Sequence, residues 1–206
     1  MTFETARLIL RPWQDSDAED LYRYASSPDV GPIAGWPAHT SVENSLDIIH
    51  RVLSARETYA VILKDAGHAV GSVGLMIGKV SGKRLPEDEG EIGYWLGVPF
   101  WGQGLIPEAV NEMLRYGVMD LRLKKIWCGY FDGNVKSKRV QEKCGFVYRY
   151  TRENVPCSML HDLRTEHVSC LTRERWEGLR PTGCPKRVRG APRGEGTTPR
   201  ASSRPG

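Results

Sequence analysis

Apolar residues recur at spacings of three and four along three segments of the chain, and this spacing predicts helices. Ser16 and Thr40 each stand three residues before a Glu, which is typical of a capping box, and apolar residues at helical spacing follow both. The strongest period lies beyond Pro107, with apolar residues at positions 110, 113, 114, 117, 118 and 121. We therefore expect three amphipathic helices, the last of them opened by Pro107.

Other segments are β-branched and apolar, or alternate with a period of two, and these predict strands. They cover residues 7–13, 58–64, 69–78, 91–100, 124–131, 146–154 and 166–176. The two runs joined by Asp65–His68 form a hairpin pattern. In the run over 91–100, Ile92, Tyr94 and Leu96 share one face, and Glu91, Gly93 and Trp95 share the other. Strands and helices alternate, so the fold class is mixed α/β around one sheet.

Net charge divides the chain into two parts. The whole chain carries a formal charge of +4, but residues 178–206 hold seven Lys/Arg against one acidic residue, which leaves residues 1–177 slightly acidic. We expect one domain over 1–177 and a disordered basic tail rich in Gly, Pro and Arg over 178–206. The tail lacks interleaved aromatics, so nucleic-acid binding through it would be nonspecific and is not the leading prediction.

Cysteine usage and the absence of targeting signals point to the cytoplasm. The five cysteines are an odd number without a Cys-x-x-Cys pair, which argues against a zinc site or a disulfide framework. The histidines have no metal-ligand spacing, and no metal is expected. No apolar run approaches the ~20 residues that span a membrane, and the N-terminus lacks the layout of a secretory signal.

The stretch "VPFWGQGLIPEAV" (98–110) suggests an anion site. It runs from a strand through Gly102 and Gly104 to a helix start at Pro107. Backbone N–H groups at a helix N-terminus have no internal partner, and glycines let a phosphate approach them. A tight turn without a ligand is the alternative. The motif is neither a P-loop nor a dinucleotide fingerprint, because Pro107 stands at the third glycine position.

A second segment, "GYFDGNVKSKRVQEKCGF" (129–146), raises the odds of a ligand site. Asn134 and Ser137 stand three residues apart at the start of a helix expected over 135–144, where Asn134 or Asp132 is the cap and Gly145 ends the helix. Both side chains would therefore face one ligand.

These two segments, together with "TARLILRPW" (5–13), resemble the GNAT superfamily of N-acetyltransferases. The resemblance is to the branch related to ribosomal-protein N-terminal acetyltransferases, and it covers nearly all of residues 3–176. It implies a mixed, mostly antiparallel sheet that splays between its fourth and fifth strands and is flanked by helices. The pantetheine arm of acetyl-CoA would enter that splay, with the pyrophosphate on the amides of Trp101–Ile106.

The resemblance also supplies the expected cofactor contacts. These are Leu96, Val98, Trp101, Gly102, Gln103, Gly104, Leu105, Ile106, Asn134, Ser137 and Lys143. Ile106 departs from the family pattern, which usually has Gly or Ala there, although its amide is unchanged. Among Lys136, Lys138 and Arg139, one is expected to meet the 3′-phosphate, and a solvated helix face is the alternative.

Two residues are candidates for catalysis. An N-terminal amine has a pKa near ~8, so a modest base acting through a water suffices, and Glu91 is our candidate. Many relatives place a Tyr acid at the position of Gln141, so Ser137 is the expected donor to the departing thiolate. A solvated strand-start carboxylate and a helix Ser with a local backbone bond are the alternatives. A backbone amide such as that of Leu96 would hold the thioester carbonyl.

The acceptor is predicted only by class. Trp36, Glu91 and Tyr94 are expected to line its site, and for Trp36 an ordinary loop anchor is the alternative. The site would take a primary amine: a protein or peptide N-terminus, or a small molecule. Relatives are often dimers, so a homodimer is one expectation. We predict direct acetyl transfer from acetyl-CoA to that amine. The alternative is a non-catalytic acyl-CoA-binding or sensor module.

Overall fold

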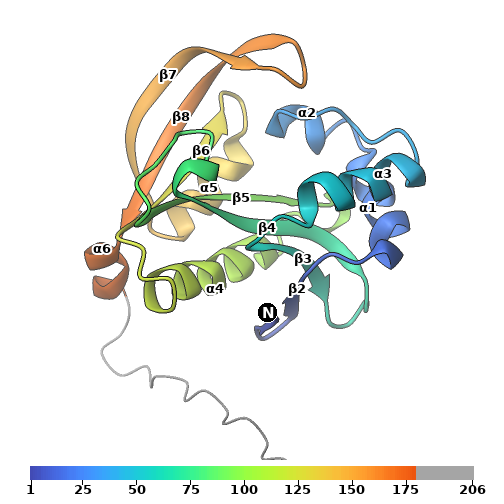
Figure 1. The fold of residues 1–206 in the computed structure, drawn as a ribbon, viewed down its shortest axis with the longest axis horizontal. Helices are drawn as coiled ribbons and strands as arrows, with labels where there is room; N and C mark the ends of the chain where they lie inside the picture. The colour runs from blue at the N-terminus through green and yellow to red at the C-terminus, as the bar shows by residue number, and fades with distance from the viewer. Residues whose placement is uncertain (180–206) are drawn as a thin grey trace, which may run out of the picture.

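An eight-stranded sheet runs through the middle of the molecule in the order β1-β2-β3-β4-β5-β6-β8-β7 (Figure 1). The structure is a computed structural model, and it describes residues 1–179. The strands are β1 (Phe3–Glu4), β2 (Leu8–Arg11), β3 (Thr58–Leu63), β4 (Ala69–Ile77), β5 (Glu89–Leu96), β6 (Lys125–Phe131), β7 (Val147–Cys157) and β8 (Asp162–Thr172). Neighbours are antiparallel except for β5 and β6, which are parallel.

Helices cover both faces of this sheet. The α-helices are α1 (Ala18–Ala25), α2 (Gly31–Ala34), α3 (Val42–Ile48), α4 (Leu105–Met119), α5 (Val135–Lys143) and α6 (Arg173–Gly178). Shorter helical turns are η1 (Asp15–Asp17), η2 (Ile49–Leu53), η3 (Gly78–Val80) and η4 (Val98–Phe100). α4 lies along one face, while α1 and α3 lie against the other (Figure 1).

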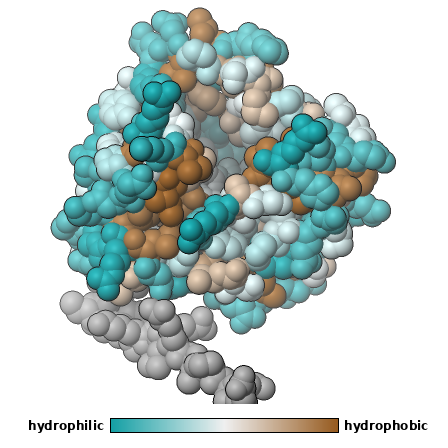
Figure 2. Space-filling view, viewed as in Figure 1, coloured by the Kyte–Doolittle hydropathy of each residue, from teal (hydrophilic) through white to brown (hydrophobic). Residues whose placement is uncertain are grey.

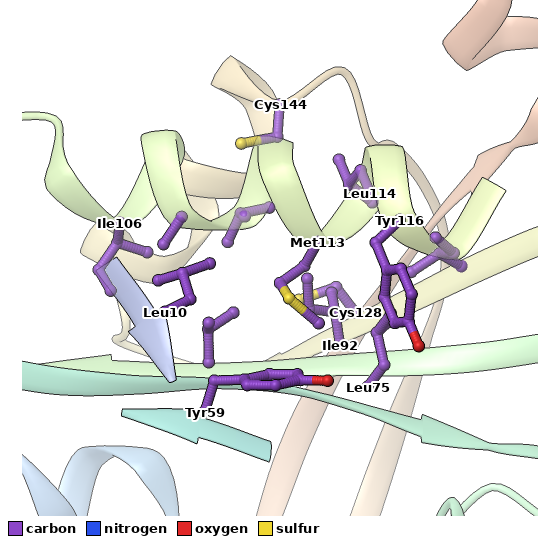
Figure 3. Packing of buried hydrophobic residues seen from close by; sticks show 14 of the residues in the cluster. Leu10, Tyr59, Leu75, Ile92, Ile106, Met113, Leu114, Tyr116, Cys128 and Cys144 are labelled. Atoms are coloured by element: carbon purple, nitrogen blue, oxygen red, sulfur yellow. The ribbon is translucent and has the colours of Figure 1, made fainter. Parts of the chain in front are cut away.

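Period-two alternation in the strands feeds both cores. In β3, Tyr59 and Val61 join the cluster under α4, while Ala60 and Ile62 join the cluster under α1 and α3. Figure 3 shows the first cluster, where Met113 and Leu114 of α4 lie over the sheet. The mixed, mostly antiparallel sheet flanked by helices is therefore confirmed.

The parallel pair β5–β6 is short. Its register covers only Glu89 to Glu91 opposite Lys125 to Trp127, and the two strands do not pair beyond that point. The sheet thus opens between these strands, which are the fourth and fifth if the two-residue β1 is set aside. β5 is held on its other edge by β4 from Gly90 to Leu96.

Three helix starts differ from the sequence prediction. The first helix is preceded by η1, and the Asp17 carboxylate accepts the Gln14 N–H, so Ser16 is not the cap. Ser41 rather than Thr40 caps α3, accepting the Asn44 N–H at 3.1 Å. In both places a neighbouring polar side chain competes for the same role, and spacing alone could not choose between them.

The third shift concerns α4, which begins at Leu105 and not at Pro107. Gly104 adopts a left-handed conformation with φ of +75° and turns the chain into the helix two residues early. Pro107 is therefore the third helical residue, where its missing N–H is still one that the helix does not use.

The last predicted strand is also partly wrong. Residues 173–176 belong to α6, because Thr172 ends β8 and accepts the Arg175 N–H with its hydroxyl at 3.3 Å. Gly178, where the predicted tail begins, closes α6, and the tail from residue 180 onward lies outside the described residues. Within residues 1–179, no helix is long and apolar enough to cross a membrane.

Candidate active site

The loop before α4 presents free backbone donors. Gly102 and Gly104 have φ of +79° and +75°, a region that favours glycine. Within the described residues, no side chain caps the start of α4, so the amides of its first turn have no protein acceptor there. A Cβ at Gly102 would meet nothing within 4 Å, so space lies open beside the loop. The geometry suits an anion held by main-chain N–H groups.

Ile106, the departure from the family pattern, has a packing explanation. Its side chain is 5% exposed and lies in the core near Leu10 (Figure 3). Leu105 is buried in the same cluster. The larger side chain therefore points into the core, while its backbone amide stays in the first turn of α4.

Arg7, immediately before β2, supports the loop, a role that the sequence pattern did not indicate. Its Nη1 donates to the Gln103 carbonyl at 2.9 Å, and its Nε pairs with Glu108 at 2.7 Å. Glu108 also accepts the Thr5 hydroxyl at 2.6 Å. Burial alone would raise the pKa of Glu108, but the bonds from Thr5 and Arg7 outweigh it, and the pKa is lowered. Thr5 and Arg7 lie in the quoted first-strand motif, which was the available signal.

The free edge of β5 faces the opening in the sheet. Gly97 donates its N–H to Val70 of the β4 side at 2.8 Å. Antiparallel pairing alternates, so the odd-numbered residues of β5 bond to β4 and the amides of Tyr94 and Leu96 point the other way. The Leu96 carbonyl accepts the Trp101 indole N–H at 2.8 Å, which joins this edge to the glycine loop.

The start of α5 closes the opening from the other side. Asn134 is its cap, as one of the two sequence alternatives had it, and its Oδ1 accepts the Ser137 N–H at 3.1 Å. The Ser137 hydroxyl lies 3.0 Å from the Tyr94 hydroxyl. Burial raises the pKa of Tyr94 far above its usual value, so the phenol stays protonated. Lys136 places its Nζ 3.8 Å from the centre of the Trp101 ring.

Tyr94 therefore lies beside Ser137 on the face that carries α4 and α5. Glu91 lies on the opposite face of β5, because the two residues are an odd number of positions apart. The structure does not bring Tyr94 together with Glu91 and Trp36, the other two residues predicted to line the acceptor site. Lys143 is exposed in the last turn of α5, at the opposite end from Asn134.

Gln141 lies on α5 one turn beyond Ser137, at the position where relatives carry a Tyr. It is 2% exposed, and neither its amide nitrogen nor its amide oxygen has a hydrogen-bond partner within the described residues. An amide cannot replace the phenol as a proton donor to sulfur in the same way. Ser137, which was predicted as the proton donor in place of a Tyr, lies four residues earlier in the same helix.

Glu91 is part of a charged cluster on the other face of the sheet. Its carboxylate accepts the Ser81 hydroxyl at 2.6 Å and pairs with Lys83 Nζ at 2.9 Å. The same ammonium lies 2.5 Å from Glu166 of β8. A Cβ at Gly129 of β6 would collide with the Glu166 carboxylate, so the glycine makes room for it.

Aromatic side chains continue this face beyond the charged cluster. Trp95 of β5 lies 5.9 Å from Trp36 and 6.3 Å from Trp13, measured between ring centres. Trp95 is four residues from Glu91 in the same strand, so it shares the face of that carboxylate. Trp36 and Glu91 thus lie on one side of the sheet, and their place in an acceptor site stays a prediction.

The surface has a cleft beside α5 and a recess between α2 and β8. A cleft of about 550 Å³ lies beside α5, and of the residues considered for catalysis or cofactor binding its lining includes Lys138 alone; the lining is Tyr130, Asp132, Gly133, Val135, Lys138, Gln141, Glu142, Phe146, Tyr148, Thr151, His167 and Ser169. A recess of about 290 Å³ is lined by Ile33, Phe131, Asp132, Arg164 and Thr165. Figure 2 shows this side of the molecule hollowed between α2 and the β7–β8 hairpin, with apolar residues on both sides.

The sheet thus opens beside a bare helix N-terminus, and the Glu91 carboxylate lies on the far face. The family model described as an acetyltransferase (GNAT) domain matches residues 7–147. The chain belongs to the GNAT acetyltransferase family, whose members use acetyl-CoA. The predicted resemblance is confirmed, and the protein is an acyltransferase.

Named relatives agree with this family. The uncharacterized N-acetyltransferase p20 of Bacillus licheniformis is 33% identical over 131 residues, which are 61% of this chain and 70% of the relative. A GNAT-family acetyltransferase from Bacillus anthracis has a similar structure, with a TM-score of 0.72 and 23% identity over 84% of this chain and 99% of that one. The ribosomal-protein-S5-alanine acetyltransferase from Vibrio fischeri gives a TM-score of 0.66 and 20% identity over 85% and 98%. The two solved structures establish a shared fold.

Proposed function

We propose that the protein transfers the acetyl group of acetyl-CoA directly to a primary amine, either a protein or peptide N-terminus or a small molecule. One observation carries the proposal. The uncapped start of α4, the free edge of β5 and the start of α5 meet around one opening in the sheet, and Glu91 stands on its far side.

The residues around the opening fit acetyl-CoA. The glycine loop and the first amides of α4 suit the pyrophosphate, and the unpaired amides of Tyr94 and Leu96 suit the amide groups of a pantetheine arm. When bound, acetyl-CoA supplies an activated acetyl thioester. Lys136, held over Trp101, is the best placed of the three α5 cations considered for a phosphate contact.

Glu91 is the proposed base. The acceptor must lose a proton to become a nucleophile, and a carboxylate reaches that proton directly or through one water. Ser81 and Lys83 hold the carboxylate in place, so its position is fixed before the acceptor arrives. The bond between Lys83 and Glu91 must open or shift for the carboxylate to take a proton.

Ser137 is the proposed donor to the departing sulfur. Its hydroxyl lies 3.0 Å from that of Tyr94, whose raised pKa keeps it a proton donor across the neutral range. Tyr94 is therefore assigned to the cofactor side, where it orients Ser137. Trp36 is assigned to the acceptor side, next to Trp95.

The acceptor class follows from the branch of the family. A structural neighbour is named as a ribosomal-protein-S5-alanine acetyltransferase, so a protein N-terminus is one candidate, and polyamines and aminoglycosides are the small-molecule candidates. We also propose the homodimer and the cytoplasmic location that the sequence analysis predicted.

The test is thiol release from acetyl-CoA in the presence of N-terminal peptides, polyamines and aminoglycosides, with the acetylated product identified by mass spectrometry. The proposal expects release with at least one amine and none without an amine. If CoA binds while every amine fails, the chain is an acyl-CoA sensor instead. If CoA does not bind, both readings are wrong.

A further inference from the structure

One lysine of the chain stands beside the proposed base. Lys83 lies in the segment Ser81–Asp88 between η3 and β5, which is drawn in green in Figure 1. Its ammonium bonds to Glu91 at 2.9 Å and to Glu166 at 2.5 Å. Its side chain is only 8% exposed, although the segment around it has no regular structure.

The position of this ammonium coincides with the point where the sheet opens. Glu91 is the last residue of β5 that pairs with β6, opposite Trp127. Glu166 reaches the same point from β8 over the bare backbone of Gly129. A primary amine of the chain therefore lies where the proposed reaction requires the amine of an acceptor.

The Lys83 ammonium is surrounded by two carboxylates, and a second cation pairs with one of them. Glu91 and Glu166 are the two carboxylates, and Lys83 is the buried cation between them. Arg152 pairs with the second oxygen of Glu166 at 3.3 Å and is partly exposed. Two buried carboxylates this close need a cation, because unpaired buried charge is costly. Whatever displaces Lys83 must therefore bring a positive charge of its own.

Lys83 itself is poorly suited to be acetylated. Burial would lower the pKa of its ammonium, but the attraction of Glu91 and Glu166 outweighs this, and the pKa is raised. A protonated amine is no nucleophile, so the lysine behaves as a bound cation.

We propose that Glu91 and Glu166 form an ammonium-binding pair for the acceptor, and that Lys83 is a built-in occupant which the acceptor displaces. This inference rests on the proposed function for its biological meaning. It narrows the acceptor to an alkylammonium that matches a lysine side chain: a charged primary amine on an unbranched carbon chain. Segment Ser81–Asp88 must move as the acceptor enters.

A binding experiment tests the pair without any catalysis. Lys83→Ala removes the occupant beyond its Cβ, and n-butylammonium has the four carbons and the ammonium group of a whole lysine side chain. We expect this ion, at ten times its Kd, to raise the Tm of the full-length Lys83→Ala protein by roughly 4 °C. The wild type and the exposed-lysine control Lys79→Ala should not shift, and tetramethylammonium, which has no N–H donor, should have no effect on Lys83→Ala.

The double variant Lys83→Ala/Glu166→Gln decides whether the pair is responsible. It should lose the stabilisation by n-butylammonium, because one carboxylate of the pair is gone. No shift in Lys83→Ala, or the same shift in wild type and the double variant, would overturn the proposal.

Kinetics give a second readout, and they keep the proposal testable if Lys83→Ala does not fold. Lys83→Ala should lower the KM for the acceptor about tenfold, because the lysine no longer competes with it. Glu166→Gln alone should raise that KM about tenfold, because one of the two carboxylates that bind the acceptor is lost. An unchanged KM in Glu166→Gln contradicts the inference, as does acetylation of Lys83 itself by mass spectrometry. If no amine is acetylated by any variant while n-butylammonium still binds Lys83→Ala, the proposed function fails and the ammonium pair stands.

Discussion

The two faces of the sheet opening are built in different ways. On the face with α4 and α5, the important groups are backbone amides: those of the loop Trp101–Ile106 and the free edge of β5. On the other face, the important groups are charged side chains: Lys83 and Glu91, which are close in the chain, and Glu166, which is far from both.

Because of this difference, the two faces respond differently to amino-acid substitution. A backbone site tolerates Ile in place of Gly or Ala at position 106, because the side chain turns into the core while the amide stays. A site made of side chains changes its binding groups whenever one of those residues is substituted. The constant substrate of the family is therefore expected on the first face, and the variable acceptor on the second.

The largest effect is expected at Glu91. Glu91→Gln removes the proposed base and should lower kcat by about 100-fold, within the range for general-base catalysis, with little change in the Kd for acetyl-CoA. Glu89→Gln is the matched control, since Glu89 lies on the same face of β5 but pairs with Lys125 and Trp127. Steady-state kinetics decide the matter: equal losses in both variants would mean that the carboxylates are structural.

A smaller effect is expected at Ser137. Ser137→Ala should lower kcat by about 30-fold through loss of the proton donor, and Tyr94→Phe should lower it less, because Tyr94 only orients that hydroxyl. Acetyl thioesters of CoA analogues whose thiol is a better leaving group than that of CoA should restore most of the rate of Ser137→Ala. A Tyr94→Phe variant that loses more activity than Ser137→Ala would reverse the two roles.

The glycine loop should respond in binding rather than in kcat. Gly102→Ala should weaken CoA binding about tenfold by calorimetry, because a Cβ and a strained φ disturb the main-chain donors. Gly67→Ala controls for strain alone, since Gly67 has φ of +71° in a hairpin turn and equally open surroundings. Matching losses of CoA affinity would show that Gly102 has no special role.

The charged face should also respond to pH. The pKa of Lys83 is raised above its ordinary 10.5, so its contribution to the free energy of unfolding is fully present below that pH and is lost as the pH rises through the folded-state value. The stability difference between wild type and Lys83→Ala should therefore be constant from neutral pH to about pH 10 and shrink above it. Urea titrations at several pH values measure this, and a difference that grows with pH would contradict the assigned pairing.

The smallest effect is expected outside both faces. Deletion of residues 180–206 should leave the kcat, the KM values and the Tm close to those of the full chain, because α6 is retained. Any RNA binding removed by this deletion should be strongly salt-dependent. A loss of acetyl transfer on deletion would give the basic segment a part in the reaction.

The sequence could predict the backbone face well. Helical period placed α4, and the Asn-to-Ser spacing placed the start of α5 with Asn134 as one of two possible caps. The start of α4 was missed by two residues because the left-handed conformation of Gly104 begins the helix, and the spacing of apolar residues does not indicate backbone conformation. The fold class followed from alternating elements, and the family signature added the opening in the sheet.

The charged face could be predicted only in part. Glu91 was found because it lies in a motif, but Lys83 and Glu166 are 83 residues apart and carry no pattern. Lys83 stands in an irregular polar segment, where a lysine normally faces solvent. Its burial follows from its pairing with Glu91 of β5 and Glu166 of β8, which only the assembled fold brings together. Arg7 was missed for a similar reason, because its partners Gln103 and Glu108 are far from it in the sequence.

Hydrogen–deuterium exchange of the full-length protein with and without CoA tests the central claim most directly. The account predicts that CoA protects the amides of Trp101–Ile106 and those of Tyr94 and Leu96, while Ser81–Asp88 exchanges as before. Protection confined to the cleft beside α5, or no protection in the glycine loop, would contradict it.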